Sequence, residues 1–404
     1  MDALTTPLPK TWQKVRLGDI AEIKRGASPR PIENPKWFCT NSNVGWVRIS
    51  DISKNSRFLY KTAQKLSKKG IEKSRFVKQN SLIMSMCATV GKPIITKIDT
   101  CIHDGFVVFK NPKIDLNYLY YFLCYIEKEW LESGQQGSQV NLIKNKEVFC
   151  PKDLDEQAAI ANILSDVDHY LCSLDALILK KESVKKALRI KMLNQILASN
   201  GVEFRKLGDI ILSLKTGLNP RSFFKLNTPN ANNYYVTIRE LEDYTIKFTH
   251  QTDRIDDNAL SLCLKRSNLE KDDILFSGTG TIGKVSIIEK NPNNWAIKEG
   301  IYSIKPNKKI VFPRFLMFCL ESSNIQNDIK NKSFGGIVKS IPMNDLQQIQ
   351  IPLPPLNEQI AIANILSGLD SEIISLKNKK HQFENIKKAL NHDLMSAKIR
   401  VLNK

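Results

Sequence analysis

The sequence contains an internal duplication, because a series of short motifs recurs in the same order after about 190 to 202 residues. The matching segments are Leu17–Ile20 with Leu207–Ile210, Gly26–Arg30 with Gly217–Arg221, Val47–Ile52 with Val236–Leu241, Thr89–Lys92 with Thr281–Lys284, Gly105 with Gly300, and Glu156–Ser165 with Glu358–Ser367. Their shared order makes chance a poor explanation. Two copies are too few for a solenoid, so the 404 residues predict one module of about 200 residues present twice.

Each copy begins with about 150 residues of short β-like runs separated by turn residues. The strand candidates are Trp46–Ile52, Ser81–Met86, Pro93–Ile98 and Gly105–Phe109 in the first copy, and Tyr234–Ile238, Ile274–Phe276, Val285–Ile288 and Gly300–Ile304 in the second. A helical stretch interrupts them in each copy, at Leu116–Trp130 and Pro313–Ile329. This mixture predicts an α+β fold, with globular domains at residues 1–154 and 201–355.

The remaining segments, residues 155–200 and 356–404, have the apolar spacing of long helices. Apolar residues recur at intervals of three and four, which is typical of a coiled coil. The predicted seam consists of Leu164, Val167, Leu171, Leu174 and Ile178 with Leu366, Leu369, Ile373, Leu376 and Phe383. Lys181, Lys185, Lys380 and Lys387 fall in the same frame, so we expect the seam to loosen midway. Asp155 and Asn357 resemble N-caps.

A helix of some 40 residues is roughly 60 Å long and has no core of its own, so it needs a partner. The nearest partner with a matching period is its own duplicate. Antiparallel pairing of the two helices would place the globular domains at opposite ends of a dumbbell. Two separate amphipathic helices, each packed on its own domain, remain the alternative.

The charge balance predicts a polyanionic partner. Lys and Arg number 60 against 41 Asp and Glu, which gives a net charge of +19. A proteome with a general lysine bias is the alternative explanation. The chain contains no run of 18 apolar residues and no apolar stretch at its N-terminus, so we expect a cytoplasmic protein without a membrane partner. The eight cysteines are scattered without a C-x-x-C pair, which indicates neither a zinc site nor a disulfide framework.

One segment imitates a nucleotide-binding loop. Gly278–Gly283 fits G-x-G-x-x-G, and Gly278–Lys284 nearly fits a Walker A loop, but a β-like run follows where a helix is required. The first copy, Met86–Gly91, lacks two of the three glycines. We interpret the shared Thr-Val/Ile-Gly-Lys as a tight connection between strands with a cation at its tip. No catalytic or metal-binding arrangement appears elsewhere, so we expect no enzyme; a nucleotide-using enzyme built on Gly278–Lys284 is the alternative.

DNA reading requires Arg, Lys, Asn and Gln side chains that reach base edges within a field of cations that contact phosphate. The candidates, which lie next to predicted turns, are Lys24, Arg25, Arg30, Lys68, Lys69, Lys73, Arg75, Lys92, Gln139 and Asn141 in the first copy, and Lys215, Arg221, Arg239, Lys265, Arg266, Lys284 and Lys339 in the second. The polar loops of the two copies are unrelated although their frame residues match. One scaffold is therefore expected to carry two reading surfaces for two dissimilar half-sites. If both faced one side of the duplex, the half-site centres would lie about one helical turn apart, or a multiple of it.

The sequence resembles the specificity (S) subunit of type I restriction-modification systems over essentially its whole length. The resemblance is carried by Ile351–Gln359 (Ile-Pro-Leu-Pro-Pro-Leu-Asn-Glu-Gln) with Ile362–Leu366, by the weaker Cys150–Gln157, and by Gly26–Pro29 and Thr281–Lys284. The first copy lacks both later prolines, which leaves the entry into its helix open. The resemblance implies two target-recognition domains joined by an antiparallel helical pair, and recognition of a bipartite, asymmetric site on double-stranded DNA.

The resemblance also implies partners. Two methyltransferase (modification) subunits would bundle against the helical pair, and restriction subunits would complete the assembly. S-adenosylmethionine, ATP and Mg²⁺ would bind those partners, and no cofactor would bind this chain. A helical adaptor that binds only protein, with incidental charge, is a further alternative.

Overall fold

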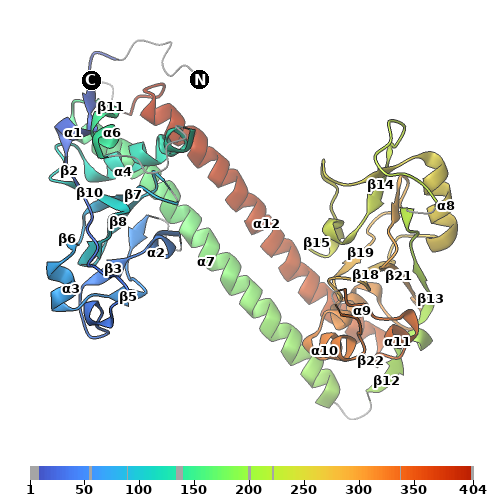
Figure 1. Cartoon of the computed structure of the whole chain (residues 1–404). Helices are drawn as coiled ribbons and strands as arrows, with labels where there is room; N and C mark the ends of the chain where they lie inside the picture. Colours follow the sequence, from blue (N-terminus) through green and yellow to red (C-terminus); the bar gives the residue numbers. More distant parts are fainter. Residues whose placement is uncertain are drawn as a thin grey trace. The chain divides into compact units, whose positions relative to one another are not determined.

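The structure is a computed structural model that describes residues 9–53, 57–88, 90–132, 140–198, 202–220, 223–336 and 338–401. The chain divides into two compact units. The first consists of Met1–Leu174 with Lys380–Lys404, and the second of Asp175–Lys379. Each unit therefore contains a globular part and a segment of both long helices, α7 (Leu154–Ala198) and α12 (Leu356–Met395) (Figure 1).

The first unit contains two sheets and a strand pair. Its strands are β1 (Trp12–Arg16), β2 (Glu22–Arg25), β3 (Gly45–Val47), β4 (Phe58–Leu59), β5 (Gln64–Lys65), β6 (Arg75–Val77), β7 (Leu82–Ser85), β8 (Pro93–Thr96), β9 (Thr100–Ile102), β10 (Phe106–Lys110) and β11 (Glu147–Pro151). Its short helices are α1 (Leu17–Ile20), α2 (Ile49–Ser53), α3 (Lys68–Glu72), α4 (Leu116–Tyr125), α5 (Glu127–Glu132) and α6 (Val140–Asn145). The sheet orders are β2-β10-β7-β8-β4 and β5-β3-β9-β6, and β1 pairs with β11.

The second unit is built in the same way. Its strands are β12 (Glu203–Lys206), β13 (Ile211–Thr216), β14 (Asn233–Val236), β15 (Leu241–Glu242), β16 (Thr245–Ile246), β17 (Arg254–Ile255), β18 (Ile274–Ser277), β19 (Val285–Ile287), β20 (Trp295–Ile297), β21 (Ile301–Pro306) and β22 (Gln350–Leu353). Its short helices are α8 (Asp257–Ser267), α9 (Pro313–Leu320), α10 (Ser323–Asn331) and α11 (Met343–Gln347). The sheet orders are β13-β21-β18-β19 and β17-β14-β20, with the pairs β15-β16 and β12-β22.

The two units share one topology. The antiparallel order β2-β10-β7-β8 recurs as β13-β21-β18-β19, and the closing pair β1-β11 recurs as β12-β22. The parallel pair β3-β9 recurs as β14-β20. The predicted α+β fold with an internal duplication is therefore confirmed.

Two strand predictions extend too far. The predicted strand Trp46–Ile52 ends at Val47 and turns into α2, and the predicted strand Tyr234–Ile238 ends at Val236 before a 3-10 turn, Ile238–Glu240. A buried acid stabilises each turn. Asp51 accepts the backbone N–H of Arg48, and Glu240 accepts that of Thr237. The two predicted helices are also each broken in two, as α4 with α5 and as α9 with α10.

A buried glutamine anchors the start of each long helix to its globular part. Gln157 Oε1 accepts the backbone N–H of Asp115 at 2.8 Å, and its Nε2 donates to the Pro151 carbonyl at 2.7 Å. Gln359 Oε1 accepts the N–H of Phe312 at 2.8 Å, and its Nε2 donates to the Pro354 carbonyl at 2.9 Å. The first copy makes both kinds of contact without the later prolines, but its accepting carbonyl lies six residues before the glutamine, against five in the second copy.

The N-cap predictions are wrong by two residues. The helices α7 and α12 begin at Leu154 and Leu356, so Asp155 and Asn357 lie inside the first turn. Asp153 takes the capping position in the first copy, where its side chain accepts the Asp155 N–H at 3.0 Å.

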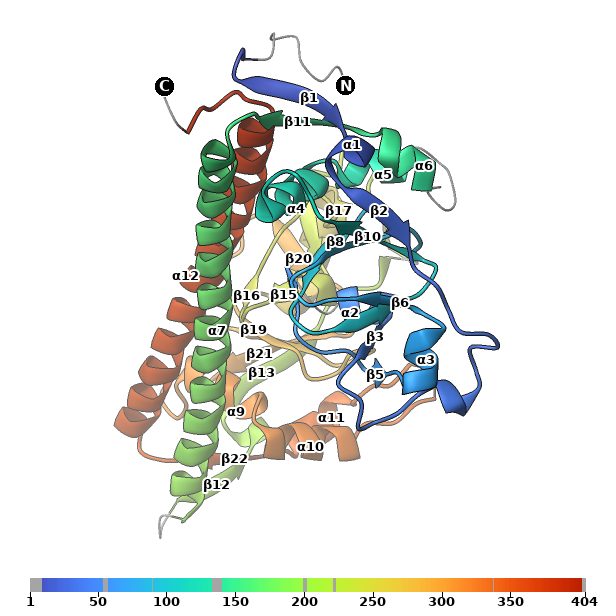
Figure 2. The ribbon, with the colours of Figure 1, turned by 90° about the vertical axis from the view of Figure 1, so that its left-hand side faces the viewer.

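Within each unit the segments of α7 and α12 lie side by side and run antiparallel (Figure 2). In the first unit Asp168 pairs with Lys387, and the Tyr170 ring lies 4.5 Å from the Phe383 ring. In the second unit the paired residues are Lys181 with Glu372 and Lys185 with Asp370. The predicted seam residues are buried (Leu164, Leu174, Ile178, Leu366 and Ile373) or partly buried (Val167, Leu171, Leu369, Leu376 and Phe383).

The helices pair with each other and also pack on their own domains, so the alternative of two separate helices is wrong. Ile160 and Leu164 of α7 belong to the core of the first unit, and Ile362 and Leu366 of α12 to the core of the second. At the seam lysines, where we expect loosening, three of the four pair with a carboxylate of the other long helix. Each of these lysines has a carboxylate partner, with Lys380 pairing to Glu384 on its own helix.

Candidate nucleic-acid interface

Three segments of the first unit meet where the parallel strands β3 and β9 end. Because the strands run in the same direction, Arg48 after β3 and His103 after β9 lie at the same sheet edge. The segment 26–30 crosses this edge, where the Ala27 N–H donates to the Ile102 carbonyl at 3.0 Å. A Cβ on Gly26 would lie 1.9 Å from the His103 carbonyl oxygen, so this crossing requires glycine. The duplicated motif at Gly26 thus serves a close backbone approach.

Asp104 organises the polar side chains at this edge. The Ser28 hydroxyl donates to Asp104 Oδ1 at 2.7 Å, and Arg30 Nη2 donates to Oδ2 at 3.2 Å. Arg25 Nε donates to the Asp104 backbone carbonyl at 2.7 Å. The hydrogen bond from Ser28 is the main reason that the pKa of Asp104 lies below its ordinary value. The carboxylate is therefore a charged acceptor surrounded by arginines at neutral pH.

Ser28, Arg30 and Asp104 line a pocket of about 330 Å³, together with Trp46, Arg48 and His103. His103 Nδ1 accepts the Gly105 N–H at 2.9 Å, which leaves Nε2 as the protonated nitrogen of the neutral ring. Burial lowers the pKa of His103, so the neutral form is favoured. Arg48 is exposed, and its guanidinium group forms no hydrogen bond or ion pair with any residue that the structure describes. The pocket therefore offers both donors and an acceptor.

The second unit has an equivalent edge at the ends of β14 and β20. Thr237 follows β14, and Lys298 and Glu299 follow β20, with the side chains of Lys298 and Glu299 exposed. The Lys298 N–H donates to the Val236 carbonyl at 2.9 Å. A Cβ on Gly217 would lie 1.9 Å from the Ile297 carbonyl oxygen, as at Gly26 in the first copy.

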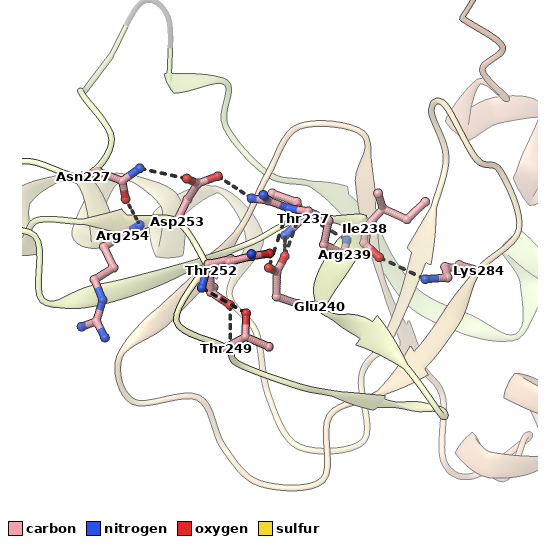
Figure 3. Close-up of polar contacts among 11 residues, drawn as sticks. Asn227, Thr237, Ile238, Arg239, Glu240, Thr249, Thr252, Asp253, Arg254 and Lys284 are labelled. Atoms are coloured by element: carbon pink, nitrogen blue, oxygen red, sulfur yellow. Dashed lines mark hydrogen bonds and ion pairs between the residues drawn. The ribbon is translucent and has the colours of Figure 1, made fainter. Parts of the chain in front are cut away.

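A hydrogen-bond network fixes the side chains around Thr237 (Figure 3). Arg239 Nη2 donates to Asp253 Oδ2 at 2.7 Å, and Asn227 Nδ2 donates to Asp253 Oδ1 at 2.9 Å. Lys284 Nζ reaches the Ile238 carbonyl at 3.3 Å from the neighbouring β18–β19 connection. Two predicted cations, Arg239 and Lys284, therefore meet at this edge.

Of the remaining candidates, Arg75 lies at the edge formed by β3 and β9 in the first unit, and the other described candidates lie elsewhere. Arg75 joins Arg25 and Arg30, because its Nε donates to the Arg25 carbonyl at 3.1 Å. The others lie on separate surfaces: Lys24 paired with Glu22, Lys68 and Lys69 on α3, Lys73 at its end, Lys92 between β7 and β8, Asn141 on α6, Lys215 on β13, Lys265 and Arg266 in the last turn of α8, and Lys339 beside Gly280. Gln139 and Arg221 lie outside the residues that the structure describes.

The sequence interpretation missed the residues that directly follow the parallel strands. These are Arg48, His103 and Asp104 in the first unit and Thr237, Lys298 and Glu299 in the second. They were detectable in principle, because Arg48 and Thr237 follow the first residue of a shared motif, and the other four residues directly precede the matched Gly105 and Gly300. Their clustering depends on parallel pairing, which the strand patterns do not reveal.

The segment Gly278–Lys284 forms a turn between the antiparallel strands β18 and β19. The Gly283 N–H donates to the Ser277 carbonyl at 2.9 Å, and the Gly91 N–H makes the same bond to Ser85 in the first unit. The predicted tight connection is confirmed. A strand follows Lys284, so this loop lacks the helix N-terminus that holds a pyrophosphate.

The described residues can also be judged against the requirements of disulfides, membrane-spanning helices and metal sites. All eight cysteines are free. No helix in the described ranges has both the length and the apolar character needed to cross a membrane. Within the same ranges, no group of three or more His, Cys, Asp or Glu side chains is placed to hold a metal ion.

Comparison with known proteins agrees with this architecture. An S subunit of a type I restriction-modification system from M. genitalium matches with a TM-score of 0.61 at 16% identity, over 96% of this chain and 98% of that one. A chain from a study of assembly and conformational transition of the type I system matches with a TM-score of 0.57 at 15% identity, over 96% of this chain and 99% of that one. At this identity the agreement concerns the fold.

Sequence comparison extends the agreement to the family. A Methanocaldococcus jannaschii protein, described as a candidate specificity subunit of type I restriction enzyme MjaX, is 26% identical over 420 residues, which is 98% of this chain and 95% of the relative. The family model for the type I restriction modification DNA specificity domain matches residues 9–181 and 199–385, once for each copy of the duplication. The chain therefore belongs to the type I restriction-modification DNA specificity family.

Proposed function

We propose that this chain is the DNA-reading specificity subunit of a type I restriction-modification complex and recognises a bipartite, asymmetric site on double-stranded DNA. In this proposal residues 1–154 and 201–355 are the two target-recognition domains, and residues 155–200 and 356–404 are the spacer helices. One observation carries it: the two units share a backbone frame but place different side chains at the equivalent edge. Two identical surfaces would read a symmetric site, whereas two different ones read dissimilar half-sites.

The electrostatic character of the chain supports DNA as the ligand. A net charge of +19 favours binding to phosphate, and the arginines around Asp104 and the cations around Thr237 add groups of the kind that contact bases. The candidate cations and amides predicted from the sequence, Gln139 and Arg221 included, are proposed as the wider DNA-contacting set.

The partner subunits are also part of the proposal. Two methyltransferase subunits would bind the spacer helices, and restriction subunits would complete the complex. Methyl transfer and cleavage would then belong to partners, together with S-adenosylmethionine, ATP and Mg²⁺. Such a complex acts on DNA in the cytoplasm, where we place this chain.

The test is reconstitution of the chain with its methyltransferase partner, followed by sequencing of modified bases. We expect methylation at one bipartite sequence. Exchange of residues 201–350 for those of another family member should change one half-site and leave the other intact. Unchanged specificity after this exchange would contradict the modular reading of DNA.

Salt provides an independent check. If several phosphates are contacted, the logarithm of affinity should fall steeply with the logarithm of salt concentration. Replacement of the exposed Lys68 and Lys69 by alanine should lower this slope by about 2 if both contact phosphate. A flat salt response of the unmodified complex would favour the protein-only adaptor instead.

A further inference from the structure

We infer that the solvent-accessible residues directly following each parallel strand pair determine which base is read: Arg48 and His103 beside Asp104 in the first unit, and Lys298 beside Glu299 in the second. The inference rests on the proposed function and goes further, because it assigns the specificity of each half-site to named positions. The ligand in each case is the edge of a base pair.

The first argument is that the backbone at these positions is fixed in the same way in both units. The Arg48 N–H donates to Asp51 Oδ2 at 2.9 Å, and Asp51 Oδ1 also accepts the Ala63 N–H at 3.0 Å. The Thr237 N–H donates to Glu240 Oε2 at 2.8 Å (Figure 3). Asp51 and Glu240 are only 6% and 3% exposed. A buried acid therefore fixes the backbone at each position: in the first unit it leaves the Arg48 side chain exposed, whereas in the second the Thr237 hydroxyl also donates to Glu240 Oε2, at 2.7 Å, and stays buried.

The second argument is the mixture of charges at each edge. A phosphate site would contain donors alone, because a carboxylate repels phosphate. Here arginine or lysine stands next to an acid, Asp104 in the first unit and Glu299 in the second. Base edges in the major groove present both kinds of partner: guanine O6 and N7 accept hydrogen bonds, and the amino groups of cytosine and adenine donate them. The composition of the edge therefore favours bases over the backbone.

The third argument concerns the availability of the donors. The Arg48 guanidinium is exposed, without a hydrogen bond or ion pair to any described residue, and the Arg30 side chain is 74% exposed. His103 presents its Nε2–H, because Nδ1 is occupied by the Gly105 N–H. These groups can change partner on binding without breaking the fold. In the second unit the Thr237 hydroxyl is buried and already donates to Glu240, and the exposed Lys298 replaces the imidazole, so a different base is expected there.

The experiment exchanges these positions between the units. The variant Arg48→Thr/His103→Lys gives the first unit the side chains of the second, and Lys298→His gives the exposed position after β20 the imidazole of the first unit. Each variant is assembled with the methyltransferase subunits, and methylated sites are mapped by sequencing. We expect the first variant to lose about tenfold to a hundredfold preference for the original base at one position of one half-site, with the other half-site unchanged. The second variant should affect the other half-site.

The matched control is Lys68→Ala/Lys69→Ala, which should weaken binding equally across sequences. Arg48→Ala removes only an exposed side chain, so it carries the test if the double variant does not fold. Folded variants that methylate the original site with unchanged preference at every base would overturn the inference while leaving the proposed function intact. Methylation without sequence preference by the unmodified complex would overturn the proposed function itself.

Discussion

Lys185 of α7 is buried between the two long helices of the second unit, where its ammonium group pairs with Asp370 of α12. A shift of 202 residues leads to the equivalent pair in the first unit, Lys387 with Asp168. A tyrosine hydroxyl joins each pair, because Lys185 donates to Tyr244 at 2.8 Å and the Tyr121 hydroxyl donates to Asp168 at 2.7 Å. The duplication thus places an equivalent polar contact between the two long helices in each unit, more deeply buried in the second unit than in the first, and we expect it to set the register of the helices.

Removing one member of the buried pair should destabilise the second unit. Lys185→Met leaves the Asp370 carboxylate without its partner in the seam, and we expect a loss of about 3 kcal/mol in the free energy of unfolding. The double variant Lys185→Met/Asp370→Leu should recover most of this loss, because no charge stays buried. Urea unfolding at neutral pH measures both values.

The control for this pair is Lys181→Ala, which breaks an ion pair whose Glu372 side chain is 55% exposed and should cost less than about 1 kcal/mol. Burial also raises the pKa of Asp370, so the loss in Lys185→Met should shrink as the pH falls and the carboxyl group takes up a proton. Equal losses in the single and double variants would show that charge burial is not the cause.

The buried glutamine at the helix entry should also be sensitive to substitution. Gln359→Met leaves the Phe312 N–H and the Pro354 carbonyl without their partners, at a cost of about 1–3 kcal/mol. Gln359→Glu should cost more, because its carboxylate still accepts the Phe312 N–H but places a negative charge against the Pro354 carbonyl oxygen. Thermal unfolding compares these variants with Glu358→Gln, an exposed neighbour that should change stability by less than about 0.5 kcal/mol. If Gln359→Met melts at the same temperature as the unmodified chain, Gln359 does not anchor the helix.

Two glycines should respond in opposite directions to alanine. Gly26→Ala places a methyl group 1.9 Å from the His103 carbonyl oxygen, so the backbone must move; we expect a loss of at least about 2 kcal/mol and weaker DNA binding. Gly368 lies within α12 with open space around its Cβ position, so Gly368→Ala should stabilise the chain by about 0.5–1 kcal/mol. Thermal melts of both variants, with DNA affinity for Gly26→Ala, provide the comparison.

His103 should make stability depend on pH. Burial lowers the pKa of its imidazole below the ordinary value of 6.5, so the unfolded chain binds this proton more readily than the folded one. The contribution of His103 to the free energy of unfolding is therefore complete above about pH 6.5. It is lost as the pH falls from there through the pKa of His103 in the folded chain. His103→Asn retains an acceptor for the Gly105 N–H and removes the titration. The difference in unfolding free energy between the unmodified chain and His103→Asn should change only over this pH interval. A difference that is constant with pH would contradict the lowered pKa of His103.

Local patterns were sufficient to predict much of the fold. Antiparallel strands such as β7 and β18, the tight Gly-Lys connections and the two long helices all follow from short-range periodicity and turn residues. The predictions that failed concern positions where a distant or buried side chain overrides the local pattern. Asp51 and Glu240 end two predicted strands early, because each accepts the backbone N–H of the residue three positions before it.

The sequence by itself determined the duplication, the α+β class and the family resemblance, because repeated motifs and apolar spacing are properties of neighbouring residues. Only the tertiary structure decided the composition of the candidate interface. Parallel pairing of β3 with β9 brings Arg48 to the edge that carries Asp104, and Ser28 donates to Asp104 at a separation of 76 residues. Lys185 likewise meets Asp370 at a separation of 185 residues. Such contacts arise when distant segments bury a shared surface, and no local periodicity encodes them.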